Sequence, residues 1–355
     1  MAGGGGTRLW PLSSPGRPKP FLPLLGERTL LQLSADRLAG LVEPTSIFVV
    51  TDRLYAGLVA EQLPFATVLS EPRGRNTAAA IALATLAIER PEDEAMLVLP
   101  ADQTVERADA FRSALQAANR ACAGILDVAQ PIVTLGIEPT FPATVYGYIV
   151  PTERATTIRL EAGAEHRVQG VERFTEKPDR DAAEAMINGP HGASWNGGIF
   201  AWQRGTIRAA FERDAPDILA TVAEGLAGDL DAAYERVLAT SIDYAVLEPA
   251  SVAGDVLVIP ADVGWNDLGS WTSLLAELGM PGIEATITPA GQPYEAAADD
   301  VVVARTGTGV LTATPGADGT MVASNRPVAV LRGALLFQSR IEVLLDRCST
   351  PEAHP

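Results

Sequence analysis

The segment Gly3–Leu24 reads GGGGTRLWPLSSPGRPKPFLPL, with four consecutive glycines followed by spaced cations. Consecutive glycines let the backbone approach a ligand closely and point its N–H groups into an anion-binding concavity. For the glycines alone, a tail without a ligand is an equally good interpretation, but Arg8 and Lys19 favour a phosphate site. The segment is not a Walker A loop, because no Gly-Lys-Ser/Thr follows. It is not a dinucleotide fingerprint either, because prolines follow where a helix should begin.

The composition limits the kind of protein this chain can be. Of its 355 residues, 47% are hydrophobic and 20% are charged, which permits a sizeable core and excludes wholesale disorder. The net charge is 27 − 44 = −17, so general binding to nucleic acid or to anionic membranes is not expected. Any site for a phosphorylated substrate must therefore concentrate its cations locally. Lysine occurs only at Lys19 and Lys177, which indicates that a compact point charge is needed there.

No targeting or membrane segment is evident in the sequence. The longest nearly apolar run, Thr77–Ile88, is too short to span a bilayer and predicts a buried helix. The start of the chain lacks the basic and apolar stretches of a secretory signal. Cys122 and Cys348 lie far apart and the three histidines are scattered, so no zinc or redox site is predicted. The expected location is the reducing cytoplasm.

Short apolar runs alternate with amphipathic segments over the first ~270 residues, which predicts a mostly parallel sheet covered by helices. The predicted strands are Ile47–Val50, Ala95–Leu99, Ile132–Gly136, Val168–Phe174, Gly198–Trp202 and Asp255–Ile259. The predicted helices are Thr29–Leu38, Thr77–Ile88, Ala108–Cys122, Thr206–Arg213 and Leu230–Ala239. The first of these helices opens with a Thr29–Gln32 capping box.

A second, smaller domain is predicted after a Pro- and Gly-rich break at residues 281–291. Short β-like runs follow, separated by Gly, Pro and Asp: Val301–Ala304, Val310–Thr312, Met321–Ala323, Val328–Leu331 and Leu335–Phe337. The predicted organisation is therefore a catalytic α/β domain over residues 1–278 and a small C-terminal β domain over residues 292–355.

Seven further sequence blocks follow the glycine-rich segment. In order, they are EPRGRNTAAAIA (Glu71–Ala82), LVLPAD (Leu97–Asp102), YGYI (Tyr146–Ile149), FTEKP (Phe174–Pro178), WNGGIF (Trp195–Phe200), SIDYAVLE (Ser241–Glu248) and GWNDLGSW (Gly264–Trp271). With GTRLWPLS and the later PK, they make the chain resemble the sugar nucleotidyltransferases, and within them the GTP:mannose-1-phosphate guanylyltransferases. A lone glycine loop would be a weak signal, whereas eight blocks in the family order are a strong one.

The resemblance implies a Rossmann-like nucleotidyltransferase domain with a mixed, mostly parallel sheet. It implies transfer of GMP from GTP to α-D-mannose 1-phosphate with Mg²⁺ as cofactor, giving GDP-mannose and pyrophosphate. Catalysis of such a transfer is mostly alignment and charge neutralisation. The implied catalytic residues are Arg8, which would clamp phosphate oxygens, Lys19 near the α-phosphate, and the metal ligands Asp102 and Asp267. Whether the chain forms a homodimer is not decided by the sequence.

Two more groups of site residues are implied by the resemblance. The nucleotide-binding group is Gly3, Gly4, Gly6, Thr7, Glu71, Asn76 and Thr77. The sugar-phosphate-binding group is Gly147, Glu176, Lys177, Asn196 and Gly197. Asn76 is equally interpretable as a plain helix N-cap, and core or pocket wall is the favoured interpretation of Trp195 and Trp265.

The two aspartates also have a physical reading of their own. Asp102 follows the apolar run MLVLP and so should lie at the carboxyl end of a strand, where open α/β sheets bind ligands. Two carboxylates together with phosphate oxygens suit Mg²⁺. Taken singly, each could instead be an ordinary capping or turn aspartate. Family members have histidine after the first aspartate, whereas Gln103 stands here.

Two regions depart from the family pattern. About five apolar residues normally precede the glycine loop as a central strand, but Met1 and Ala2 stand in their place. Either the recorded start lies inside the gene, or the chain lacks that strand and should be poorly stable. After Pro327–Leu331, the segment RGALLFQSRIEVLLDRC does not resemble the usual valine-rich strand and acidic turn, which would fit an altered or mis-framed tail.

Three functions therefore remain to be separated. The first is a guanylyltransferase acting on mannose 1-phosphate. The second is a transferase for another hexose 1-phosphate or nucleotide. The third is a non-catalytic relative that binds a sugar nucleotide.

Overall fold

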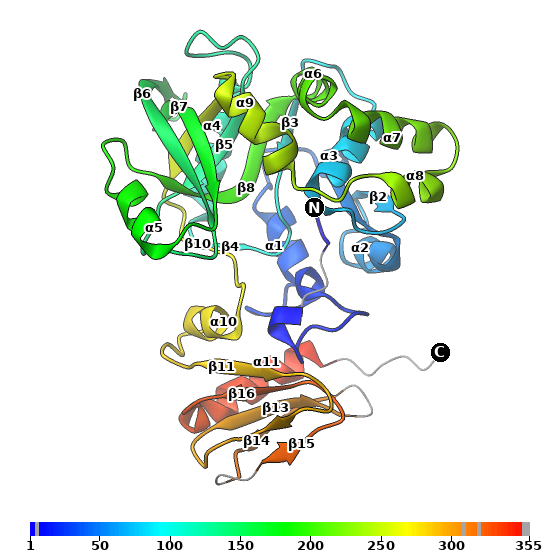
Figure 1. The fold of residues 1–355 in the computed structure, drawn as a ribbon, viewed down its shortest axis with the longest axis vertical. Helices are drawn as coiled ribbons and strands as arrows, with labels where there is room; N and C mark the ends of the chain where they lie inside the picture. Colours follow the sequence, from blue (N-terminus) through cyan, green and yellow to red (C-terminus); the bar gives the residue numbers. More distant parts are fainter. Residues whose placement is uncertain (4–6, 307–309, 318–320, 350–355) are drawn as a thin grey trace. The chain divides into compact units, whose positions relative to one another are not determined.

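The computed structural model describes residues 1–3, 7–306, 310–317 and 321–349, which form two compact units (Figure 1). Unit 1 comprises Met1–Ala2, Ala35–Pro100 and Val105–Trp265. Unit 2 comprises Gly3–Ser34, Ala101–Thr104 and the described residues from Asn266 onward. The start of the glycine-rich segment therefore folds with the C-terminal strands. None of the helices in the described ranges is long and apolar enough to cross a membrane.

A six-stranded sheet in the order β3-β8-β5-β9-β7-β6 forms the centre of unit 1. Its strands are β3 (Ala95–Val98), β5 (Ile132–Ile137), β6 (Gly147–Arg159), β7 (Glu165–Glu176), β8 (Ser194–Gln203) and β9 (Val256–Ala261). The pairing is mixed, as expected, but the expectation of a mostly parallel sheet is wrong. Within this sheet only β5 and β9 pair in parallel, and the other described pairings are antiparallel.

The direction of the strands explains that error. Apolar runs predict strands but carry no information on which way each strand runs. The hairpin of β6 and β7, joined over residues 160–164, must be antiparallel because so short a connection cannot cross back over the sheet. The six strands expected in the first part of the chain all exist. The strands β6, β2 (Thr67–Glu71) and the two-residue strands at Thr104–Val105 and Trp265–Asn266 were missed.

Strand β1 (Phe48–Asp52) pairs in parallel with β2 and stands apart from the larger sheet. The first two residues connect the two sheets. Ala2 donates from its backbone N to Val50 O at 2.9 Å and forms a parallel bridge with Thr51, while the Met1 amino group donates to Leu99 O at 2.8 Å. Met1 and Ala2 therefore lie between the ends of β1 and β3, where the central strand was expected.

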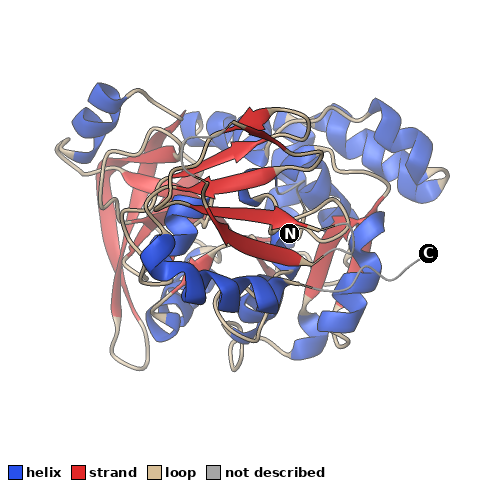
Figure 2. Ribbon diagram, turned by 90° about the horizontal axis from the view of Figure 1, so that it is seen from below, coloured by secondary structure: helices blue, strands red, loops and turns tan. Residues whose placement is uncertain are grey.

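Helices pack against the strands of unit 1. Figure 2 distinguishes helices from strands by colour over the described chain. The helices of unit 1 are α2 (Ala56–Gln62), α3 (Asn76–Ala87), α4 (Ala108–Ala121), α5 (Arg180–Ile187), α6 (Arg204–Asp214), α7 (Pro216–Ala227), α8 (Leu230–Arg236) and α9 (Glu248–Val252). Shorter turns are η3 (Pro44–Ser46), η4 (Arg53–Tyr55) and the π-helical η5 (Asp243–Leu247). The short strands β4 (Thr104–Val105) and β10 (Trp265–Asn266) lie where the chain passes between the units.

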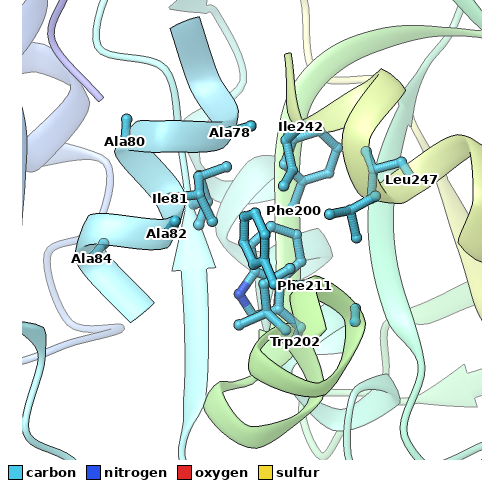
Figure 3. Close-up of a cluster of buried hydrophobic side chains, with 14 of the residues drawn as sticks. Ala78, Ala80, Ile81, Ala82, Ala84, Phe200, Trp202, Phe211, Ile242 and Leu247 are labelled. Carbon is cyan, nitrogen blue, oxygen red and sulfur yellow. The ribbon is translucent and has the colours of Figure 1, made fainter. Parts of the chain in front are cut away.

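Two buried clusters fill unit 1, one on each face of β8. Phe200 and Trp202 belong to one cluster, whereas Ile199 and Ala201 belong to the other, as the alternation of strand side chains requires. The first cluster contains the alanine-rich helix α3, confirming the buried helix predicted from its apolar run. Figure 3 shows this helix facing Phe200, Trp202 and Phe211, with Ile242 and Leu247 alongside.

Unit 2 contains the N-terminal turns η1 (Thr7–Leu9) and η2 (Lys19–Phe21), the start of α1 (Leu30–Asp36), and α10 (Trp271–Glu277). The predicted capping box is confirmed, because Gln32 N donates to Thr29 Oγ1 and Thr29 N donates to Gln32 Oε1. An antiparallel sheet in the order β11-β16-β13-β14 follows, beside a β12–β15 pair. The strands are β11 (Ala285–Thr288), β12 (Pro293–Tyr294), β13 (Val301–Arg305), β14 (Leu311–Pro315), β15 (Val322–Ala323) and β16 (Val328–Leu331).

The tail that departs from the family pattern is helical. Leu335–Phe337, expected as a β run, forms the 3₁₀ turn η6 and leads into α11 (Gln338–Cys348). Ile341, Leu344, Leu345 and Cys348 recur at helical spacing and are buried in the core of unit 2. That spacing is the signal that the strand interpretation overlooked.

A designed extension tests the role of Met1 and Ala2 in the sheet. Five β-branched residues added before Met1 should pair with β1 on one side and β3 on the other, so the melting temperature should rise by several degrees. Differential scanning calorimetry measures the change, with a Gly-Ser extension of the same length as the control. Equal melting temperatures for both extended chains would contradict the assignment of this position to a strand.

Candidate active site

The ammonium group of Lys19 is a buried charge in unit 2. Lys19 lies in η2 and is only 6% exposed. Its Nζ donates to Asp102 Oδ2 at 3.2 Å and to the backbone carbonyl of Asp267. A buried ammonium must find acceptors for its protons, and here they come from residues 83 and 248 positions along the chain. Three of the four predicted catalytic residues therefore meet.

The fourth predicted catalytic residue, Arg8, lies close to the turn around Asp267. Asp267 Oδ1 accepts from Gly269 N at 3.0 Å, which fixes the carboxylate against the turn. A Cβ on Gly269 would overlap Asp267 Oδ2 and lie 3.0 Å from Arg8 Nη1. Only glycine allows this close approach, so the guanidinium of Arg8 and the carboxylate of Asp267 lie against the same backbone atom.

The donor set of this cluster fits Mg²⁺ in part. Asp102 and Asp267 supply two carboxylates, and the Asp102 side chain is 35% exposed. Among the described residues no group of three or more His, Cys, Asp or Glu could hold a metal. Mg²⁺ usually takes one or two carboxylates and completes its shell with water and substrate phosphates. The site therefore suits a metal that arrives with a phosphorylated ligand.

The predicted nucleotide-binding residues fall in both units. Gly3 is exposed with open space around it, and Thr7 begins η1 in unit 2. Gly4 and Gly6 lie outside the described residues. Glu71, Asn76 and Thr77 belong to unit 1, at the end of β2 and the start of α3.

Glu71 is a buried carboxyl group, 6% exposed, at the last position of β2. Its carboxyl group lies beside the hydroxyl of Tyr234, and this contact partly offsets the effect of burial on the pKa of Glu71. Burial raises the pKa of Glu71 to about 7. A buried carboxyl group with a raised pKa at the end of a strand is an uncommon feature that marks a candidate for ligand recognition.

The turn between β2 and α3 is held by polar contacts. Asn76 is the first residue of α3, adopts a φ of 65°, and accepts at its Oδ1 from the adjacent Thr77 N at 2.8 Å. An N-cap side chain accepts instead from an N–H two or three residues further on, so this contact is not the N-cap bond expected. Thr77 Oγ1 accepts from Ile242 N at 2.8 Å. Arg75 donates to the backbone carbonyls of Tyr234 and Glu235, which ties the turn to α8.

The predicted sugar-phosphate residues meet at one end of the hairpin β6–β7 and of β8. Gly147 pairs with Glu176 in the strand register, and a Cβ on Gly147 would come within 2.6 Å of Glu176 Oε2 and 3.5 Å of Asn196 Cβ. Lys177, with a φ of 45°, turns its Nζ back to form an ion pair with Glu176. Gly197 packs close to Ile137, because a Cβ there would lie 3.0 Å from Ile137 Cγ1.

Aromatic side chains stand beside this group. Trp195 contacts the edges of Phe141 and Tyr146, each with ring centroids 5.0 Å apart, and Tyr146 lies 5.3 Å from Trp265. The Trp195 ring is buried while Phe141 is about half exposed. Trp195 is therefore a core residue, and Trp265 packs partly buried against the same cluster.

One polar residue of this region was missed. Asp243 accepts a 2.6 Å hydrogen bond from Asn196 Nδ2, although only the block SIDYAVLE around it attracted notice. Sequence alone could not pair these residues, which lie 47 positions apart.

A family model described as Nucleotidyl transferase matches residues 1–278. The chain belongs to the nucleotidyl transferase family. It is 42% identical over 294 residues to a mannose-1-phosphate guanylyltransferase of Escherichia coli K12, a match that covers 77% of this chain and 58% of that protein. It is 41% identical to mannose-1-phosphate guanylyltransferase ManC of Salmonella typhimurium, over the same shares of both chains. The chain thus spans a little more than half the length of these curated relatives.

A solved nucleotidyl transferase relative has the same fold. The crystal structure titled mannose-1-phosphate geranyltransferase, from Thermus thermophilus, matches with a TM-score of 0.71 and 33% identity. The match covers 89% of this chain and 93% of that one. The mixed α/β fold followed by an antiparallel C-terminal sheet is therefore shared with a member of the family.

The burial of Glu71 predicts how stability depends on pH. Because its pKa in the folded chain, about 7, exceeds the ordinary value of 4.5, the unfolded chain loses this proton first. Stability should therefore fall as pH rises from 4.5 to about 7, by up to roughly 3 kcal/mol. Glu71→Gln should remove this contribution and make the chain more stable than wild type at pH 8.

Urea unfolding at several pH values measures the effect. Glu61→Gln, at an exposed position of α2, is the matched control and should keep the wild-type pH dependence. A Glu71→Gln chain with the unchanged wild-type slope would contradict the burial argument.

Proposed function

We propose that this chain transfers GMP from GTP to α-D-mannose 1-phosphate and releases pyrophosphate, making GDP-mannose. The observation that carries the proposal is the meeting of Arg8, Lys19, Asp102 and Asp267 in one cluster. The names of the relatives described above supply the nucleotide and the sugar.

The cations of the cluster suit phosphoryl transfer. Lys19 presents a compact charge that stabilises negative charge developing at the α-phosphate, and Arg8 can clamp two phosphate oxygens at once. Because Lys19 is already fixed by Asp102 and the Asp267 carbonyl, little reorganisation is needed at the moment of reaction. The sugar phosphate attacks the α-phosphorus directly, since no motif positions a nucleophilic side chain for a covalent intermediate.

Mg²⁺ is the proposed cofactor, held by Asp102 and Asp267. When bound it would neutralise charge on the phosphate oxygens. Carboxylate oxygens are ligands that Mg²⁺ prefers, and the ion completes its shell with water and phosphate oxygens, which suits a site proposed to receive a triphosphate.

The other residues are proposed to bind the two substrates. Gly3, Gly4, Gly6, Thr7, Glu71, Asn76 and Thr77 are proposed to hold the nucleotide. Gly147, Glu176, Lys177, Asn196 and Gly197 are proposed to hold the sugar phosphate, with carboxylate and amide groups for hydroxyls and the Lys177 ammonium for phosphate. The same proposal places the catalytic domain at residues 1–278 and a small β domain at residues 292–355. It also places the protein in the cytoplasm.

A coupled assay of pyrophosphate release tests the function. The chain is incubated with Mg²⁺, each of the four NTPs in turn, and mannose, glucose or galactose 1-phosphate. The proposal predicts that GTP with mannose 1-phosphate gives the highest kcat/KM, by at least ~10-fold, which corresponds to ~1.4 kcal/mol. Preference for another pair would instead make the chain a different hexose-1-phosphate nucleotidyltransferase.

The assay also distinguishes the proposed enzyme from a non-catalytic protein that binds a sugar nucleotide. Such a protein would bind GDP-mannose in calorimetry yet release no pyrophosphate with any pair. That result would contradict the proposed transfer.

A further inference from the structure

Both the nitrogen and the oxygen of the Asn196 side-chain amide form hydrogen bonds. Its Nδ2 donates to Asp243 Oδ1 at 2.6 Å, and its Oδ1 accepts from Gly198 N at 3.0 Å. Gly198 has a φ of 68°, which aims its N–H back toward the asparagine side chain. One Nδ2 proton and one lone pair of Oδ1 remain for a ligand.

The carboxylate of Asp243 decides which way that amide faces. If the amide were reversed, its oxygen would meet the Asp243 oxygen and its NH₂ group would meet the Gly198 N–H. Both contacts would be repulsive, since acceptor would face acceptor and donor would face donor. A carboxylate accepts from an amide more strongly than a neutral group does, so Asp243 makes the observed orientation strongly preferred.

The backbone around Asp243 is itself anchored. Asp243 begins the π-helical turn η5, a type of turn that often occurs at functional sites. The preceding residue, Ile242, donates to Thr77 Oγ1, and Ala78 N donates to Thr240 O at 3.2 Å. The side chains of Ile242 and Leu247 are buried against Phe200 (Figure 3). Asp243 is thus fixed between α3 and β8.

The surroundings of Asp243 make its ionised carboxylate energetically unfavourable in the folded chain. Burial raises its pKa, and the nearby carboxylate of Glu176 acts in the same direction. Within the described chain no lysine or arginine forms an ion pair with Asp243. A carboxylate placed here without a cation loses free energy on folding, and its strongest compensation is the bond to Asn196.

We propose that Asp243 is a positioning residue for the sugar phosphate, because it holds the Asn196 amide so that the free Nδ2 proton is presented to a sugar hydroxyl. The inference rests on the proposed function and names a residue of the same site. A Cβ on Gly147 would lie 3.5 Å from Asn196 Cβ and 2.6 Å from Glu176 Oε2, so the side chains of Asn196 and Glu176 flank the same glycine. A correctly oriented amide donor there complements the carboxylate, which can only accept hydrogen bonds when ionised.

A double-mutant cycle on turnover tests the proposal. Asp243→Ala should raise the KM for mannose 1-phosphate roughly 10- to 100-fold, the range expected for losing a hydrogen bond to a charged group. The KM for GTP should change less than ~3-fold, since the amide serves the sugar alone. Asp243→Asn keeps an oxygen acceptor and should recover most of the loss.

The remaining variants separate positioning from other effects. In the Asn196→Ala background, Asp243→Ala should have almost no further effect, because both changes remove the same interaction. Glu248→Gln removes a neighbouring carboxylate that does not bond Asn196, so it should leave the KM for mannose 1-phosphate near the wild-type value. Additive effects of the two alanine changes, or an equal rise in both KM values, would overturn the proposal.

A readout without turnover keeps the two proposals distinguishable. Hydrogen exchange of the Asn196 side-chain amide, followed by NMR, should be slower in wild type than in Asp243→Ala. Equal rates would overturn the role of Asp243 whether or not the chain is active. Slow exchange in a wild-type chain that releases no pyrophosphate would contradict the proposed reaction alone.

Discussion

The hydrogen bonds of the Lys19 ammonium are the contacts on which the cluster of Arg8, Lys19, Asp102 and Asp267 depends. They connect the N-terminal segment, the loop after β3 and the turn after β10, which lie far apart in the sequence. A buried ammonium group needs hydrogen-bond acceptors. Burial of Lys19 therefore requires that Asp102 and the Asp267 carbonyl are in place. Arg8 follows from the same turn, because Gly269 leaves room for it. Substrate phosphates would meet charges that are already oriented.

The distribution of charge bears on the proposed binding of phosphorylated ligands by so acidic a chain. With a net charge of −17, the protein as a whole repels them. Local cations offset this effect: Arg8 and Lys19 in unit 2, and Lys177 beside Glu176 in unit 1. Both lysines of the chain therefore occur next to a carboxylate, where an ammonium can neutralise one charge and still reach another.

Local patterns and ordered motifs predicted much of this protein. The capping box of α1 and the burial of α3 follow from short-range chemistry. Arg8, Lys19, Asp102 and Asp267 lie together in unit 2, and their role stays a prediction. Strand direction could not be predicted, because apolar runs look the same either way. The helix α11 was not predicted, because the short β-like runs before it favoured a continued β pattern over its helical spacing of apolar residues. The Asp243–Asn196 pair is a tertiary contact that no local pattern announces.

A double-mutant cycle on Lys19 and Asp102 tests the central claim most directly. The free energy of unfolding in urea is measured for Lys19→Met, Asp102→Asn and the double variant. If the ammonium joins the segments as described, the two changes should be coupled by about 1–3 kcal/mol, with the double variant less destabilised than the sum. Additivity to within about 0.5 kcal/mol would contradict the account, because Lys19 and Asp102 would then contribute to stability independently.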